Sequence, residues 1–190
     1  MEFSVFVDVF GWAREDFQLP LEVITCGFSK TVTSTFNIPL SVDQTIEMIN
    51  VDDYDALAIP GGFEEYGFYE EAYDERFLSL IRRFEAQQKP IASICVAALA
   101  LGKSGILQER KATTYHLNQG QRQQQLKKYC PKVIEQQALV IDQQVITSYC
   151  PETAPAVAFA LLEMLTSNYD ANQVRIAMGF EPQKSLEEII

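Results

Sequence analysis

The segment Pro90–Gly102, PIASICVAALALG, decides the fold. Its first part, 91–94, is a short apolar run behind a proline, which is typical of a buried strand. Its second part, 96–102, consists mostly of small helix-forming residues, and Gly105 follows it as a stop signal. The pattern therefore predicts a strand that turns directly into a helix, with Cys95 on the sharp elbow between them.

Cys95 lies at a predicted junction of strand and helix, and the other three cysteines, Cys26, Cys130 and Cys150, lack this setting. A cysteine on such an elbow lies over the N-terminus of the following helix, where free N–H groups and the positive end of the helix dipole favour the thiolate. The thiolate is the reactive form of sulfur. We therefore expect Cys95 to be a nucleophile, and the alternative is a cysteine that only packs, as most free cysteines do.

Strand and helix patterns alternate along the rest of the chain. Strands are expected at 2–10, 31–36, 55–59 and 112–114 and on both sides of a turn at 142–143, and helices at 16–28, 70–87, 119–129 and 151–165. Such alternation predicts an α/β fold, a doubly wound parallel sheet with helices on both faces. A length of 190 residues suits one domain over residues 1–190.

Composition excludes several classes of partner. The chain has 26 acidic and 15 basic residues, a net charge of −11 that repels phosphate backbones and anionic lipid, so no nucleic acid and no membrane are expected as partners. The apolar N-terminus carries acidic and no basic residues, unlike a signal peptide, which favours a cytoplasmic location. Four cysteines without CxxC spacing and a single histidine indicate neither structural disulfides nor a metal site.

Three features fall at predicted carboxyl ends of strands: Pro60–Gly62, Cys95 and Ser148–Cys150. In a doubly wound sheet these ends line the crevice where a small-molecule substrate binds. Glycine lets the backbone approach a ligand closely, so the N–H groups of Gly62 and Val96 are expected to hold a developing oxyanion.

The segments 53–62, 90–105 and 140–151 resemble the ThiJ/PfpI superfamily. The resemblance covers nearly the whole chain in the expected order. It implies a flavodoxin-like α/β sandwich similar to class I glutamine amidotransferases, usually a homodimer, with Cys95 as the nucleophile on its elbow. No metal or organic cofactor is expected for its chemistry.

The resemblance also implies an acidic residue that hydrogen-bonds the cysteine, a few residues before a Pro-Leu-Glu-Val-like segment. Aligning Pro20–Val23 with that segment places Asp16 at the acidic position, with Glu15 as the adjacent alternative. Such a carboxyl can hold the sulfur and move a proton to a substrate. The structural alternative is that Asp16 caps its helix.

Family members with a third catalytic group often have histidine directly after a Thr-Thr or Thr-Ser pair. Here Thr113–Thr114 is followed by Tyr115 and only then by His116. A one-residue offset points the two side chains in different directions. His116 is the candidate base because it is the sole histidine, Tyr115 is the alternative occupant of the site, and a loop histidine without a chemical role is a third possibility.

Two departures from the family pattern narrow the activity. Val96 follows the nucleophile where the protease branch has histidine, and Cys150–Glu152 stands where the glutaminase relatives carry His-Pro-Glu. Proteolysis and glutamine hydrolysis are therefore disfavoured.

Two further features border the same expected crevice. Cys150 at a neighbouring strand end could act as a resolving thiol for Cys95, or it could be a plain buried cysteine. The aromatic residues that follow the glycine pair could wall the pocket or form a subunit interface, and they are Phe63, Tyr66, Phe68 and Tyr69.

Two functions fit these observations. In the first, the Cys95 thiolate of a hydrolase, hydratase or lyase adds to a small electrophile, such as a 2-oxoaldehyde, a glycated adduct or an isocyanide, and Asp16 transfers protons. In the second, the protein is a redox or stress-response protein that senses the oxidation of Cys95.

Overall fold

The computed structural model describes residues 1–186, and a four-stranded sheet lies at its centre. Its order is β5-β6-β10-β9, with bounds β5 Leu57–Ile59, β6 Ile91–Ser93, β10 Val145–Ser148 and β9 Leu139–Asp142. The first three strands run parallel, and β9 pairs with β10 in an antiparallel hairpin. All three residues of β6 are buried, which explains why this strand is a continuous apolar run in the sequence.

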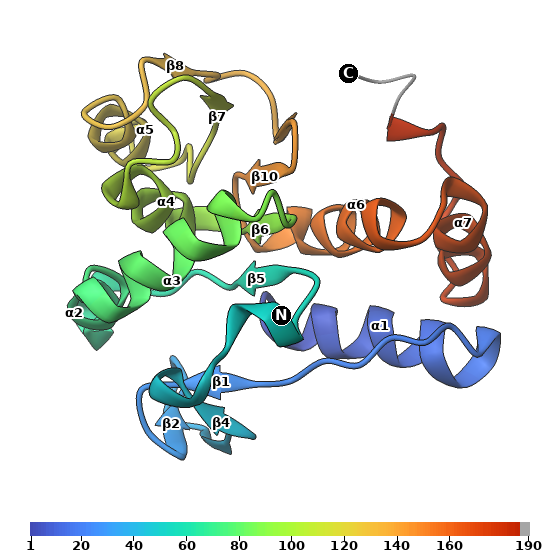
Figure 1. Ribbon diagram of the computed structural model, residues 1–190. Coiled ribbons are helices and arrows are strands. Elements are labelled where there is room, and N and C mark those ends of the chain that lie inside the picture. Colours follow the sequence, from blue (N-terminus) through green and yellow to red (C-terminus); the bar gives the residue numbers. More distant parts are fainter. Residues whose placement is uncertain (187–190) are drawn as a thin grey trace.

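Helices cover both faces of this sheet (Figure 1). On one face α6 (Ala154–Leu165) packs against β6 and β10, and α1 (Ser4–Phe17) and α7 (Asn168–Ala177) pack against α6. On the other face lie α3 (Glu75–Ala86) and α4 (Ala98–Ser104). The predicted flavodoxin-like α/β fold is confirmed, with β9 as an antiparallel edge that makes the sheet mixed.

Smaller elements surround this core. Three two-stranded pairs are β1 (Cys26–Gly27) with β4 (Gln44–Thr45), β2 (Thr31–Thr33) with β3 (Pro39–Ser41), and β7 (Lys111–Ala112) with β8 (Lys132–Val133). Two short helices are α2 (Phe68–Ala72) and α5 (Gln121–Leu126). Single 3₁₀ turns occupy Ile46–Met48, Val51–Asp53, Glu64–Tyr66, Cys95–Ala97 and Pro151–Thr153.

The N-terminal predictions are wrong. A strand at 2–10 and a helix at 16–28 were expected, but residues 4–17 form α1 and residues 18–25 form neither helix nor strand. The buried positions of α1 recur at helical spacing and are Phe6, Val9, Phe10 and Ala13. Gln18, at φ 54°, ends the helix.

The later helices match the predictions in place but not in every boundary. The helix expected at 70–87 is divided into α2 and α3, because the Asp74 carboxylate accepts from the Arg76 N–H and starts a new helix there. The helix expected at 151–165 begins with a 3₁₀ turn and becomes α-helical at Ala154. The helix α7 was not predicted, and the Ser167 side chain caps it by accepting from the Asp170 N–H.

Candidate active site

Cys95 lies on the predicted elbow between β6 and α4. Its φ of 58° is in the left-handed region, which costs a non-glycine residue about 1–2 kcal/mol. Neighbouring groups hold this conformation, since the Thr114 hydroxyl donates to the Cys95 carbonyl at 2.8 Å and the Ala97 N–H donates to the Ile94 carbonyl at 3.1 Å. Strain of this kind persists only where the surrounding structure enforces it, and it gathers at functional sites.

Gly61, at the end of β5, allows the elbow to approach. A Cβ placed on Gly61 would lie 2.7 Å from the Glu2 Oε2 atom and 3.0 Å from the Cys95 Cβ atom. Any side chain at position 61 would therefore push apart the two groups that face it. Glycine is needed here for a close approach of backbone to side chains.

The carboxyl beside the sulfur belongs to Glu2. Glu2 lies just before α1, and its Oε2 atom accepts a hydrogen bond of 2.6 Å from the Gly61 N–H. The same carboxyl group is hydrogen-bonded to the Cys95 thiol. Burial raises the pKa of Glu2, and the bond from the Gly61 N–H opposes this increase.

The pKa of the Cys95 thiol is raised above its ordinary value. Burial is the main cause, and the negative charge of Glu2 adds to it. The Val96 N–H lowers the pKa, as expected for an elbow, but the other two effects outweigh it. Burial and Glu2 thus act against the expectation that backbone geometry keeps this sulfur anionic. The raised pKa favours the thiol form of Cys95, next to the Glu2 carboxyl.

The structure does not bring Asp16 or Glu15 to this sulfur. Both are exposed near the C-terminal end of α1, and Glu15 forms an ion pair with Arg14 at 2.8 Å. A helix rises about 1.5 Å per residue, so 14 positions separate Asp16 from Glu2 by roughly 20 Å. Asp16 is also no N-cap, because the helix ends there. Helical spacing over 4–17 was the signal that could have placed Glu2 at a helix start, where acidic residues are favoured.

His116 contacts the other buried thiol of the region. Its Nδ1 atom lies 3.4 Å from the Cys150 Sγ atom, and its ring stacks on Tyr149 with the centroids 4.0 Å apart. Tyr115 is half-buried and packs against the hydrophobic core. The segment that carries both residues is tied to the elbow through Thr114, so His116 reaches the region of the site but bonds Cys150.

The expected oxyanion donors lie at the same edge of the sheet. The Val96 N–H acts on the Cys95 sulfur, and the Gly61 N–H is occupied by Glu2. Gly62 comes next in the chain, and a Cβ there would lie 2.5 Å from the Phe68 ring. Gly62 therefore lies tightly against Phe68 of α2.

Tyr69 of α2 contributes a buried hydroxyl near the sulfur. No described residue hydrogen-bonds this hydroxyl. Burial raises the pKa of Tyr69, and the charge of Cys95 contributes to the increase, which places the two side chains near each other. Arg122 holds the ring in place, since its guanidinium lies 5.3 Å from the ring centroid and pairs with Glu64 at 2.7 Å.

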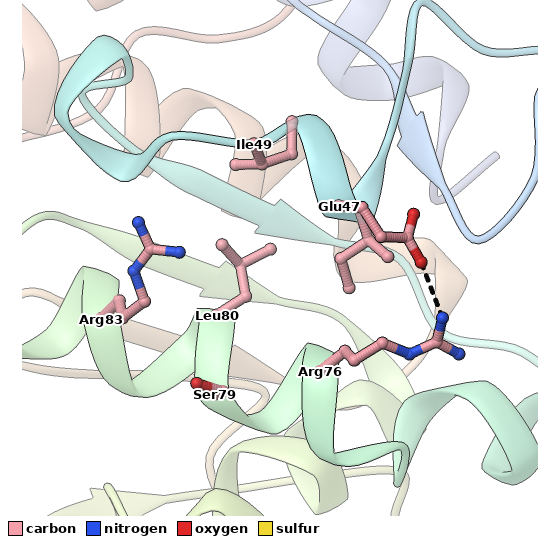
Figure 2. A pocket seen from close by; sticks show the side chains of 7 residues that line it. Glu47, Ile49, Arg76, Ser79, Leu80 and Arg83 are labelled. Atoms are coloured by element: carbon pink, nitrogen blue, oxygen red, sulfur yellow. Dashed lines mark hydrogen bonds and ion pairs between the residues drawn. The ribbon is translucent and has the colours of Figure 1, made fainter.

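A separate hollow of about 200 Å³ lies between α3 and the turn Ile46–Met48 (Figure 2). Arg76 on its rim pairs with Glu47 at 2.7 Å. Cys95 is not among its lining residues, and its volume is below the roughly 300 Å³ of ordinary ligand pockets. This hollow is therefore separate from the Cys95 site.

Among residues 1–186, no group of three or more His, Cys, Asp or Glu side chains is arranged to hold a metal ion. No helix within those residues is long and apolar enough to cross a membrane.

Comparison with known proteins agrees with this geometry. General stress protein 18 of Bacillus subtilis is 32% identical over 127 residues, 65% of this chain and 70% of that protein. Deglycase PH1704 of Pyrococcus horikoshii is 33% identical over 95 residues, 50% of this chain and 55% of that protein. Isonitrile hydratase of Pseudomonas putida is 36% identical over 84 residues, 44% of this chain and 35% of that protein. The chain thus matches about half or less of the length of the last two.

The solved structure of Drosophila melanogaster DJ-1beta shares the fold. It superposes with a TM-score of 0.81 at 23% identity and covers 95% of this chain and 91% of that one. The model of the DJ-1/PfpI family matches residues 1–164. This match spans the elbow, the glycine pair and the Glu2 carboxyl, and the chain therefore belongs to the DJ-1/PfpI family.

Proposed function

We propose that this protein is a cysteine-dependent enzyme that acts on a small reactive electrophile, with 2-oxoaldehydes and glycated adducts as the first substrate classes. The observation that carries the proposal is the pair of a buried Cys95 and a half-buried Glu2 at a strained elbow. Relatives named deglycase and isonitrile hydratase support a cysteine-dependent activity of this kind. A homodimer in the cytoplasm is part of the same proposal.

In the first step the Cys95 sulfur attacks the aldehyde carbon. Glu2 takes the thiol proton as the C–S bond forms, and the electron pair of the C=O double bond moves to the oxygen. The N–H groups of Val96 and Gly62 are the donors proposed for that oxygen. Return of the proton from Glu2 to the oxygen gives a neutral hemithioacetal.

In the second step Glu2 moves a proton between the two carbons. It removes the proton from the sulfur-bearing carbon and delivers it to the neighbouring carbon, while the hydroxyl proton on the sulfur-bearing carbon passes to the ketone oxygen. These two transfers convert the hemithioacetal into a thioester of a 2-hydroxy acid. Water then adds to the thioester carbonyl, the C–S bond breaks, and the thiol of Cys95 is regenerated. The sum is one 2-oxoaldehyde and one water converted to one 2-hydroxy acid.

Tyr69 is the proposed contact for a second substrate oxygen. A buried hydroxyl without a partner costs about 1–3 kcal/mol, and a bound carbonyl or hydroxyl group would satisfy it. The position near Cys95 suits the ketone oxygen of a 2-oxoaldehyde.

The test is turnover of methylglyoxal by the wild type, Cys95→Ser and Cys26→Ser. Cys26→Ser is the matched control, because Cys26 is an exposed thiol on β1. We expect Cys95→Ser to lose at least about 10²-fold in kcat/KM and Cys26→Ser to keep the wild-type value. Equal turnover by wild type and Cys95→Ser would refute the proposal.

The second candidate function is redox sensing at Cys95, which the relative named General stress protein 18 favours. It predicts no turnover of methylglyoxal or of an isocyanide, together with oxidation of Cys95 at low peroxide concentration. The same wild-type preparation therefore separates the two functions.

A further inference from the structure

Cys150 is a second buried thiol at the edge of the sheet that carries Cys95. Ser93 of β6 pairs in register with Thr147 of β10, and the two cysteines follow these residues by two and three positions. Neighbouring strands lie about 4.8 Å apart, and a disulfide requires a Cα separation of about 4.4–6.8 Å. The two thiols therefore follow the ends of adjacent paired strands, whose spacing lies within the range that a disulfide spans.

The electrostatic interactions of the two thiols agree with their placement at one edge of the sheet. The charge of Glu2 raises the pKa of Cys95 and also the pKa of Cys150, so the same carboxyl group acts on both thiols. Cys150 itself raises the pKa of Cys95. Burial is the largest contribution that raises the pKa of Cys150 to about 11.

His116 bonds Cys150 through two of its groups. The ring Nδ1 atom lies 3.4 Å from the Sγ atom, and the backbone N–H of His116 lowers the pKa of Cys150. Stacking on Tyr149 fixes the ring, with an angle of 27° between the ring planes. An imidazole nitrogen held in this way can accept the thiol proton when the sulfur reacts.

We propose that Cys150, with His116 as its base, is a resolving thiol that converts oxidised Cys95 into a Cys95–Cys150 disulfide. The inference rests on Cys95 being the reactive sulfur of the proposed function, and it adds a second reaction with hydrogen peroxide as the oxidant.

The chemistry has two balanced steps. Cys95 attacks peroxide, the O–O bond breaks and an S–O bond forms, so the thiol becomes a sulfenic acid and one water leaves. The Cys150 sulfur then attacks the Cys95 sulfur, the S–S bond forms and the S–O bond breaks. The Cys150 proton passes through His116 to the departing hydroxide, which leaves as a second water. Two thiols and one peroxide thus give one disulfide and two waters.

The other two cysteines provide matched controls. Cys26 is exposed on β1, and Cys130 is buried with its thiol hydrogen-bonded to the Arg110 carbonyl at 3.3 Å. Neither the Glu2 carboxyl nor the His116 ring is among the groups that act on Cys26 or Cys130. Cys26→Ser and Cys130→Ser should therefore form the same disulfide as the wild type.

The experiment is peptide mapping by mass spectrometry without reduction, after the full-length reduced protein has reacted with a small excess of hydrogen peroxide. We expect a linked Cys95–Cys150 peptide in the wild type that a dithiol reductant cleaves. Cys150→Ala should instead accumulate sulfenic and then sulfinic acid on Cys95. His116→Asn should form the disulfide roughly tenfold or more slowly, and added imidazole should restore part of the rate.

Three results would overturn the proposal: sulfinic acid on Cys95 with free Cys150 in the wild type, linkage of Cys95 to Cys26 or Cys130 instead, or no oxidation of Cys95. Turnover of methylglyoxal by the reduced protein is measured separately. Loss of the disulfide with turnover intact refutes the resolving role alone, whereas absence of turnover with the disulfide present refutes the enzymatic function alone.

Discussion

At the scale of residues, Cys95 and Glu2 form a hydrogen-bonded pair in which each group affects the pKa of the other. Burial raises the pKa of both groups, and the charge of Glu2 raises the pKa of Cys95 further, whereas the hydrogen bond with the Cys95 thiol lowers the pKa of Glu2. Groups that interact this strongly titrate together, so their apparent pKa values belong to the pair. The sulfur becomes a strong nucleophile when Glu2 accepts its proton. In the proposed first step this proton transfer occurs as the sulfur attacks the bound substrate.

Replacing Glu2 by glutamine tests its role as a base. Only the carboxylate form of Glu2 can accept the thiol proton, and burial raises the pKa of Glu2. The acid limb of the wild-type kcat/KM profile should therefore lie above the ordinary pKa of 4.5. Glu2→Gln should lose about 10²–10⁴-fold in kcat/KM and should lose this limb. A pH–rate profile measures both, and an unchanged limb in the variant would exclude Glu2.

Replacing Tyr69 by phenylalanine tests the proposed substrate contact. One hydrogen bond is worth about 0.5–1.5 kcal/mol, so kcat/KM should fall up to roughly tenfold. The free energy of unfolding should stay equal or increase, because a buried hydroxyl without a described partner is removed. Tyr66→Phe is the control, since Tyr66 is 57% exposed. Equal kcat/KM for the Tyr69 variant and the wild type would contradict the contact.

At the scale of elements, Gly61 at the end of β5 holds Glu2 and Cys95 together. A Cβ in Gly61→Ala would collide with both groups, at 2.7 and 3.0 Å. We expect a loss of about 1–3 kcal/mol in stability and a loss of most of the turnover. Gly11→Ala in α1 is the matched control, because nothing lies within 4 Å of its added Cβ and alanine favours a helix by about 1 kcal/mol. Chemical unfolding and turnover measurements distinguish the two variants. A Gly61→Ala variant with wild-type stability and turnover would contradict the packing argument.

The elbow could be predicted from sequence because its signals are local. A strand buried on both faces is an uninterrupted apolar run, and the small residues after Cys95 mark the helix that follows. The first ten residues carry a weaker pattern, in which apolar residues are so frequent that strand and helix spacing both fit. The structure decides for a helix because α1 packs on α6 and α7.

Local pattern could place Glu2 at a helix start but could not place it beside Cys95. The partner of Glu2, the Gly61 N–H, is 59 residues away in the chain, and the contact exists only because the start of α1 lies at the carboxyl ends of β5 and β6. Asp16 was chosen by aligning a short segment whose expected helix is absent from the structure. The contact of His116 with Cys150 in place of Cys95 is consistent with the one-residue offset after Thr114.

At the scale of the whole molecule, the raised pKa values of Glu2 and Cys95 make stability fall as pH rises. Each group binds its proton more tightly in the folded than in the unfolded state, so its contribution is complete below the unfolded pKa and is lost as pH rises through the folded pKa. For Glu2 this loss begins above about 4.5. The net charge of −11 adds repulsion that wild type and Glu2→Gln share almost equally.

The free energy of unfolding, measured by denaturant between acidic and neutral pH, should therefore decrease more steeply in the wild type than in Glu2→Gln. The variant gains relative stability toward neutral pH because glutamine has no charge to bury. Parallel curves for the two proteins would show that Glu2 has the same pKa in the folded and unfolded states.

The most direct test of the account is the pH dependence of Cys95 alkylation by iodoacetamide, followed on its own peptide by mass spectrometry in wild type and Glu2→Gln. The account predicts a midpoint above the roughly 8.5 of a free cysteine in the wild type and a shift to lower pH in Glu2→Gln, where the neighbouring negative charge is gone. A wild-type midpoint at or below that of a free cysteine, with no shift in the variant, would contradict it.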